Sequence, residues 1–285
     1  MSTVDHRPRT TAPSVDRAVV VAAVTLVAAT AWVLMAIGHD YQWPQDGTPP
    51  AHSYAADKAG HHGHGHGAAL TPSFSTALHR LSGWAVMVLA MMLPPALPLL
   101  HTIRAVTRRR SGSWLLTTLA ATAFTVPWLA AGLLLVGIDA TLGPTTPAAQ
   151  WVQRNLQLVA GLAVVAAGLY QFTPLKHACL SACRSPRQLA LMHWHGLAPA
   201  NDVLQIGIRY GVVCVGCCWA LMLLTLAVGW PAMPVMVAMT AAMAAERLLP
   251  QVRPLVPAIA FIAIALGIAL LAGIVPAGQI IGGHA

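Results

Sequence analysis

Charged side chains are scarce in this sequence of 285 residues. Asp, Glu, Lys and Arg together make up 8% of it, whereas a typical soluble domain carries about 25%. So few charges cannot cover a water-facing surface, which excludes an ordinary soluble enzyme and a disordered chain. Because hydrophobic residues make up 57% and the mean hydropathy is +0.66, the composition predicts an integral membrane protein.

Motifs of ATP-driven transport and of hydrolysis are also absent. The sequence has no Walker A motif and no DKTG-like phosphorylation motif, which argues against an ATP-driven pump. It has no convincing Ser-His-Asp pattern, so we expect a binding protein rather than an enzyme. The net charge of +8 does not indicate a nucleic-acid partner, because the basic residues sit in short connections and form no basic face with interleaved aromatic residues.

Seven apolar runs divide the sequence, and most of them reach the ~20 residues that a spanning helix needs. The runs cover residues 18–37, 82–103, 114–137, 151–172, 205–229, 232–249 and 255–275. Proline and glycine inside them are compatible with membrane helices, because neighbouring helices satisfy the freed backbone groups. The sequence therefore predicts an all-α, polytopic transmembrane helical bundle of about seven spans.

The basic residues predict an orientation for this bundle. If the N-terminus is cytoplasmic and the runs alternate, thirteen of the 16 Lys and Arg residues lie inside, and only Lys58, Arg80 and Arg154 lie outside. The positive-inside rule then places the N-terminus in the cytoplasm and the C-terminus outside. We expect a multi-pass protein of the inner, cytoplasmic membrane, with the lipid bilayer as its first partner.

The predicted spans divide the chain into four units. They are a cytoplasmic tail with the first helix (1–37), a flexible extracytoplasmic loop rich in histidine (38–81), a six-helix metal-binding membrane domain (82–275) and an extracytoplasmic tail (276–285). The membrane domain includes a long inner loop at 173–204. This loop and the histidine-rich loop are the only connections longer than ordinary loops.

Three cysteines and a methionine cluster in the fifth run. Cys214, Cys218 and Met222 recur every four residues and share one helical face, and Cys217 lies beside them. Thiolate and thioether ligands favour Cu(I) over hard cations, so this face is a candidate copper site. The alternative is packing alone, since buried Cys behaves as a small apolar residue and small residues allow membrane helices to approach closely.

The sixth run carries a methionine stripe that ends in a carboxylate. Four methionines follow one another at helical spacing: Met233, Met236, Met239 and Met243. Glu246 falls on roughly the same face, and a carboxylate near the membrane is costly unless it is paired or functional. These residues are candidate ligands. In the alternative, the methionines fill gaps in the packing and Glu246 pairs with Arg247 or Arg253 at the cytoplasmic interface.

The second run combines methionines with a double proline. Met87 and Met91 share a face, and Met92 lies beside them. Pro94 and Pro95 break the backbone hydrogen-bond ladder and should kink the helix. Thioethers and freed carbonyl groups would then lie together at membrane depth, so the three methionines are further candidate metal ligands.

A second cysteine pair lies in the inner loop. Cys179 and Cys183 are four residues apart, which on a helix puts both on one face but is not the C-x-x-C spacing of zinc knuckles. In the reducing cytoplasm a stable disulfide is not expected. Lys176, His177 and Arg184 favour the thiolate forms. We expect this pair to be where metal enters or leaves on the inner side.

The predicted outer loop contains a histidine-rich tract. Its core comprises His61, His62, His64 and His66. Such a tract can chelate copper, zinc or nickel with little selectivity, so we expect it to capture metal outside. The alternative is a low-complexity linker whose metal affinity is incidental.

Three segments together resemble a bacterial family of predicted metal-binding integral membrane proteins, some of them copper-chaperone-like. They are Met87–Pro94 (MVLAMMLP), Tyr170–Pro186 (YQFTPLKHACLSACRSP) and Gly211–Met222 (GVVCVGCCWALM) running on to Glu246. The resemblance covers residues 80–250. The chain departs from the family at 229–236, where Gly-Met-Asn and Trp-Met are usual, and has Glu246-Arg247 where Glu-Lys is usual. The resemblance implies metal handling, with copper as the expected metal.

The expected function is copper binding in the membrane and transfer to a partner, such as a copper-dependent oxidase or another metal-accepting protein. The ligands would form a relay from the outer histidines through the membrane methionines and cysteines to the inner cysteine pair. Three alternatives stay open: a transmembrane metal transporter, a thiol-redox membrane protein, and a structural subunit of a larger complex.

Overall fold

The computed structural model describes residues 15–37, 74–143, 146–228, 233–248 and 255–276. Within these ranges the regular structure is helical and contains no strand, which confirms the all-α prediction. In chain order the helices are α1 (Val15–Ile37), α2 (Phe74–Met92), η2 (Pro94–Ala96), α3 (Leu97–Thr107), α4 (Ser113–Leu142), α5 (Pro147–Arg154), α6 (Leu156–Tyr170), α7 (Pro174–Arg184), α8 (Pro186–His193), α9 (Pro199–Val228), α10 (Met233–Leu248) and α11 (Leu255–Leu271).

Three of the described helices, α1, α4 and α9, are long and apolar enough to cross a membrane. Two bent pairs, α2 with α3 and α5 with α6, raise the number of candidate spans to five if each pair counts as one. The apolar α11 has 17 residues and α10 has 16, so both are shorter than the ~20 residues of an untilted span. Several apolar helices therefore suit a membrane, while the seven spans and their orientation stay a prediction.

The second predicted run is kinked where its prolines occur. The axes of α2 and α3 differ by 52°, and the short 3-10 helix η2 with Pro94 and Pro95 lies between them. Neither proline can donate a backbone hydrogen bond, so the α-helical ladder of α2 ends at Met92. The predicted kink is confirmed.

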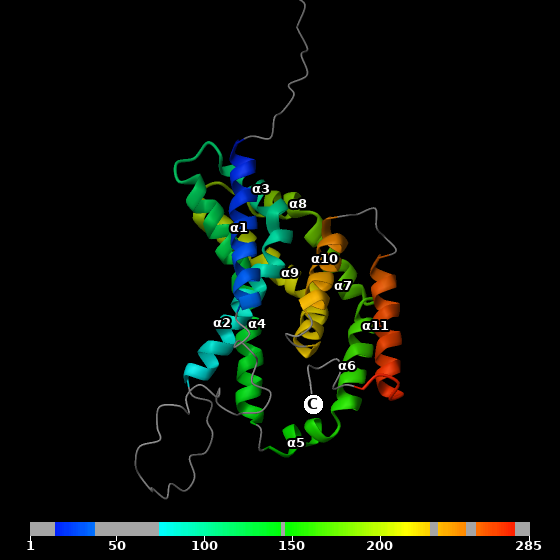
Figure 1. Cartoon of the computed structure of the whole chain (residues 1–285). Coiled ribbons are helices and arrows are strands. Elements are labelled where there is room, and N and C mark those ends of the chain that lie inside the picture. Colours follow the sequence, from blue (N-terminus) through cyan, green and yellow to red (C-terminus); the bar gives the residue numbers. More distant parts are fainter. Residues whose placement is uncertain (1–14, 38–73, 144–145, 229–232, 249–254, 277–285) are drawn as a thin grey trace, which may run out of the picture.

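The fourth predicted run, 151–172, is not one straight helix. It comprises the second half of α5 and all of α6, which meet at Asn155 with a bend of 86°. Asn155 ends α5 because its side-chain amide donates to the Trp151 carbonyl at 2.8 Å. Thr146 begins α5 by accepting a hydrogen bond from the backbone of Ala149. No residue of α5 is buried, so this short helix is a surface element at one end of the molecule (Figure 1).

Close approach between α4 and α9 forms the centre of the fold. Gly207 and Gly211 of α9 stand four residues apart, the spacing at which small residues let membrane helices meet. A Cβ atom at Gly207 would lie 2.6 Å from the Ala123 Cβ atom, and one at Gly211 would lie 2.6 Å from the Phe124 carbonyl oxygen. Only glycine fits at these positions. This packing holds the cysteine-bearing turn of α9 against α4.

The predicted inner loop, 173–204, is mainly helical. It contains α7 and α8 and the start of α9, and α7 packs against α9. Thr173 caps α7 by accepting from the Lys176 backbone, and Pro174 occupies the first turn. The buried residues of α7 are Lys176, Leu180 and Cys183, which form one helical face.

Polar contacts join the connections that we predict to be cytoplasmic. Arg104 of α3 forms an ion pair with Asp16 of α1 at 3.2 Å and donates to Ser113 of α4. Arg110 donates to the Gly196 carbonyl at 2.8 Å, which ties the α3–α4 connection to the segment before α9. The start of α1, the end of α3 and α8 accordingly lie at the same end of the molecule (Figure 1).

Candidate metal centre

Four cysteines from two helices meet in the core of the described structure. Cys214, Cys217 and Cys218 come from α9, and Cys183 comes from α7, 34 residues before Cys217. The four side chains are at most 3% exposed. We call these four residues the thiol cluster.

Distances within the thiol cluster are those of sulfur atoms in contact. The Sγ atom of Cys217 lies 3.6 Å from that of Cys183 and 3.3 Å from that of Cys218. The thiol of Cys217 also donates to the Cys214 carbonyl at 3.3 Å. Cys217 is thus the central member of the cluster.

A cation lies among these sulfurs. The guanidinium of Arg247, from α10, donates through Nη2 to the Sγ atom of Cys214 and lies 3.4 Å from that of Cys217 and 3.8 Å from that of Cys183. The sequence suggested Arg247 only as a partner for Glu246. Its contact with the thiols depends on how α10 packs on α9 and α7, and the spacing of residues within one helix does not predict this packing.

Aromatic side chains hold the thiol cluster in place. The indole Nε1 of Trp128, in α4, donates to the Sγ atom of Cys214 at 3.4 Å. The hydroxyl of Tyr210 donates to the Cys183 carbonyl at 3.0 Å, which joins α9 to the end of α7. Both rings are at most 1% exposed. They exclude water from one side of the cluster and fix the relative positions of three helices.

The other cysteine of α7, Cys179, lies at the edge of the thiol cluster. Cys179 is partly exposed, and its Sγ atom packs so closely on Gly216 that a Cβ atom there would lie 2.7 Å away. The two cysteines of the predicted inner pair therefore differ: Cys183 belongs to the buried cluster, and Cys179 lies between it and the outside of the fold.

The electrostatic environment of the two α7 thiols favours their protonated forms. The hydrogen bond with Cys217 and burial raise the pKa of the Cys183 thiol above its usual range. Burial and the neighbouring Cys217 raise the pKa of Cys179. A metal ion that binds these sulfurs must therefore displace their protons.

A buried ion pair lies next to the thiol cluster. The Nζ atom of Lys176 lies 2.9 Å from Oε2 of Glu246, and both side chains are 1% exposed. Lys176 also donates to the side-chain oxygen of Gln171, and Arg184 donates through Nε to the Glu246 carbonyl at 2.8 Å. Glu246 is thus paired with Lys176 of α7 rather than with the arginines near it in the sequence.

The predicted methionine ligands that the structure describes lie in the same core. Met87, Met91, Met92, Met222, Met236 and Met243 are buried in one contiguous cluster with the four thiols, and Met239 packs against it. The Met233 side chain lies outside the described residues, as do His61, His62, His64 and His66. In the part of the chain that is described, no group of three or more His, Cys, Asp and Glu residues is arranged to hold a metal ion.

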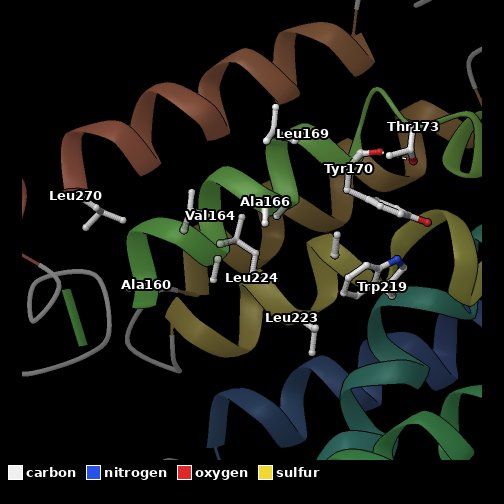
Figure 2. Close-up of a pocket in the computed structure, with 13 residues that line it drawn as sticks. Ala160, Val164, Ala166, Leu169, Tyr170, Thr173, Trp219, Leu223, Leu224 and Leu270 are labelled. Atoms are coloured by element: carbon white, nitrogen blue, oxygen red, sulfur yellow. Dashed lines mark hydrogen bonds between the residues drawn. The ribbon is translucent and has the colours of Figure 1, made fainter. Parts of the chain in front are cut away.

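A separate pocket of about 510 Å³ lies between α6 and α9. Figure 2 shows Tyr170 and Trp219 at one end of it and Leu270 of α11 at the other. The Tyr170 and Trp219 rings meet edge to face with centroids 5.0 Å apart. Most of the lining is alanine, leucine and valine, which fits hydrocarbon and not a metal ion.

Fold and core together describe an all-helical protein with apolar helices that suit a membrane and a buried cluster of cysteine sulfurs. Residues 81–270 match a family described as a copper chaperone, and since this match covers most of the chain, the chain belongs to that family. The function is therefore related to copper, and the resemblance stated from the three sequence segments is confirmed. No curated protein and no solved structure matches the chain.

Proposed function

We propose that this protein binds Cu(I) in the cytoplasmic membrane and passes it to a partner protein, such as a copper-dependent oxidase during its assembly. The thiol cluster would hold the ion, with Cys217 at its centre. The observation that supports this most directly is the convergence of Cys183 with the three cysteines of α9, because it is a contact between sequence-distant soft ligands.

The chemistry of the cluster suits a monovalent soft ion. Thiolates bind Cu(I) in preference to hard cations, and the surrounding core adds polarizable thioethers from several helices. The four cysteine side chains are buried, which would shield Cu(I) from water and oxidants. The predicted ligands Met87, Met91, Met92, Met222, Met233, Met236 and Glu246 stay proposals of this account.

Cys179 gives the proposed site a route for exchange. It is the one partly exposed cysteine, and it adjoins the cluster at Gly216. A partner thiol that reaches Cys179 would accept copper through shared ligands, without release of free ion. The histidine-rich tract at 61–66 would capture copper outside, with zinc and nickel as competitors. Seven spans with a cytoplasmic N-terminus would put the histidine-rich tract and Cys179 on opposite sides of the membrane.

Metal analysis tests this proposal. The detergent-purified protein, expressed with copper or with zinc, is compared with the variant Cys214→Ser/Cys217→Ser/Cys218→Ser and with a deletion of residues 52–67. We expect about one tightly held copper per chain, lost in the triple variant and retained in the deletion. Copper that disappears only with the histidine tract would contradict an intramembrane site.

Two other functions make different predictions in related assays. A transporter would carry copper into sealed liposomes, whereas a chaperone binds it without net flux. A thiol-redox protein would form a Cys183–Cys217 disulfide during turnover, since their sulfurs lie 3.6 Å apart, and would hold no stoichiometric metal.

A further inference from the structure

The guanidinium of Arg247 lies among the sulfur atoms of the proposed copper site. Its Nη2 atom contacts three sulfurs of the thiol cluster, those of Cys183, Cys214 and Cys217. The side chain is buried, and its Nε and Nη1 atoms have no hydrogen-bond partner. Arginine is always charged in proteins, so the centre of the cluster holds one permanent positive charge.

No carboxylate of the described residues neutralises this charge. The adjacent Glu246 is paired with Lys176 at 2.9 Å, and its second oxygen has no hydrogen-bond partner. A buried cation without a counter-charge is strongly unfavourable. The groups that Arg247 does contact are thiols, and a cation next to a thiol stabilises the thiolate. A thiolate form of Cys214 or Cys217 would complete an ion pair with the guanidinium in the metal-free protein.

We propose that Arg247 is a built-in substitute for the copper ion: its guanidinium holds the metal-free thiol cluster, leaves when Cu(I) binds, and returns when the ion is passed on. This inference rests on the proposed copper site. Both cations carry one positive charge, so the exchange of one for the other leaves the charge of the site unchanged, and only the thiol protons that are released in addition alter it. Sulfur lone pairs form the Cu–S bonds, protonated thiols that become ligands release their protons to water, and copper stays Cu(I) throughout.

Neighbouring contacts allow the side chain to move while its helix stays in place. The backbone carbonyl of Glu246 accepts hydrogen bonds from Arg184, and the Glu246 carboxylate is held by Lys176. These contacts bind the end of α10 to α7. Arg247 is the next residue and has a long side chain with rotatable bonds, so its guanidinium can turn away from the sulfurs without displacing α10.

The rate of copper release tests whether the Arg247 guanidinium takes the place of the departing ion. Protein loaded with one Cu(I) is mixed with an excess of a Cu(I)-specific chelator, and the transfer rate is measured for the wild type, Arg247→Gln and the control Arg209→Gln. Without a returning cation the ion should leave more slowly, by about tenfold or more in Arg247→Gln. Arg209→Gln, which changes an exposed arginine of α9, should release copper at the wild-type rate.

A second readout follows the arginine itself. Phenylglyoxal modification of Arg247, mapped by mass spectrometry, should increase when Cu(I) is bound, because the side chain leaves its buried position. If Arg247→Gln does not fold, this labelling of the wild type decides the question. Equal labelling with and without copper, or an unchanged or faster release from a folded Arg247→Gln, overturns the inference.

Failure of the proposed function itself looks different. In that case the wild type holds no copper that depends on Cys214, Cys217 and Cys218, and neither variant has any copper to release. If copper binding depends on these cysteines but Arg247→Gln changes nothing, the proposed copper site stands, and only the proposed exchange between copper and the Arg247 guanidinium is overturned.

Discussion

Cys183 and Cys179 differ in their contacts although they lie one helical turn apart on α7. Cys183 touches Cys217, whereas Cys179 packs on Gly216 at the edge of the fold. We therefore expect Cys183 to retain copper in the thiol cluster and Cys179 to exchange copper with a partner.

Substitution of these two cysteines gives the first prediction. Cys183→Ser should weaken Cu(I) affinity by about tenfold or more, because it removes a buried sulfur of the thiol cluster that lies against Cys217. Cys179→Ser should leave affinity nearly unchanged and slow the transfer of copper to a partner. Chelator competition measures affinity, and single-turnover transfer measures the rate. Equal losses of affinity in both variants would show that the two thiols act as one pair.

The Lys176–Glu246 ion pair gives the second prediction. Removal of one partner, as in Lys176→Met or Glu246→Gln, leaves a buried charge uncompensated and should cost about 3–5 kcal/mol in the free energy of unfolding. The double variant Lys176→Met/Glu246→Met should recover much of this loss. Thermal unfolding in detergent measures all three, and single variants as stable as the wild type would contradict a structural role for the pair.

Helical spacing was sufficient to predict which candidate side chains of α9 share a face. Cys214, Cys218 and Met222 share a buried face because the 3.6-residue repeat is a local property of one helix. The contacts of Cys183 and Arg247 with that face were not predicted, since they depend on the packing of α7 and α10. In the sequence, Arg247 stood out only as a possible partner of Glu246 and as a residue that keeps the charge expected at this position.

At the scale of elements, close helix contacts position the site. Gly207 and Gly211 let α9 approach α4, and Gly161, Gly168 and Gly267 do the same between α6 and α11. The α4–α9 contact matters most for copper, because it brings Trp128 to within hydrogen-bond distance of Cys214.

Gly211→Ala gives the third prediction. The new Cβ atom would lie 2.6 Å from the backbone oxygen of Phe124, which cannot move as a side chain can. We expect a loss of about 1–3 kcal/mol from overpacking and weaker copper binding, because α4 and α9 must separate. The matched control is Gly137→Ala in α4, where nothing lies within 4 Å of the new atom. Thermal unfolding that shows the two variants to be alike would contradict the account of this contact.

Element boundaries were predicted unevenly. The Pro94 kink follows from proline chemistry and was confirmed. The bend at Asn155 was missed, because apolarity does not distinguish a straight span from a helix joined to a surface helix. From the sequence, residues 173–204 were described as a loop and α7 and α8 were not predicted there, although Thr173-Pro174 is a typical helix-start signal.

At the scale of the whole molecule, basic residues predict the orientation. The contacts of Arg104 with Asp16 and of Arg110 with Gly196 gather the predicted inner connections at one end. The seven-span bundle needs α10 and α11 as spans besides the three long helices and the two bent pairs. Whether short helices cross a membrane depends on tilt and local thickness, which is why hydropathy alone could not decide their number.

Reporter fusions give the fourth prediction. A reporter that is active only outside the cytoplasmic membrane should be inactive when fused after Thr107 or Arg187 and active when fused after Gly143 or at the C-terminus. This pattern follows from the positive-inside rule for seven spans. An inactive reporter at the C-terminus would contradict an odd number of spans.

X-ray absorption at the copper edge tests the central claim most directly. It is measured on the wild type with one copper per chain, with the Cys214→Ser/Cys217→Ser/Cys218→Ser variant beside it. We expect Cu(I) with a first coordination shell dominated by sulfur in the wild type, and no such signal in the variant. A first shell of nitrogen or oxygen ligands in the wild type would contradict the thiol cluster as the copper site.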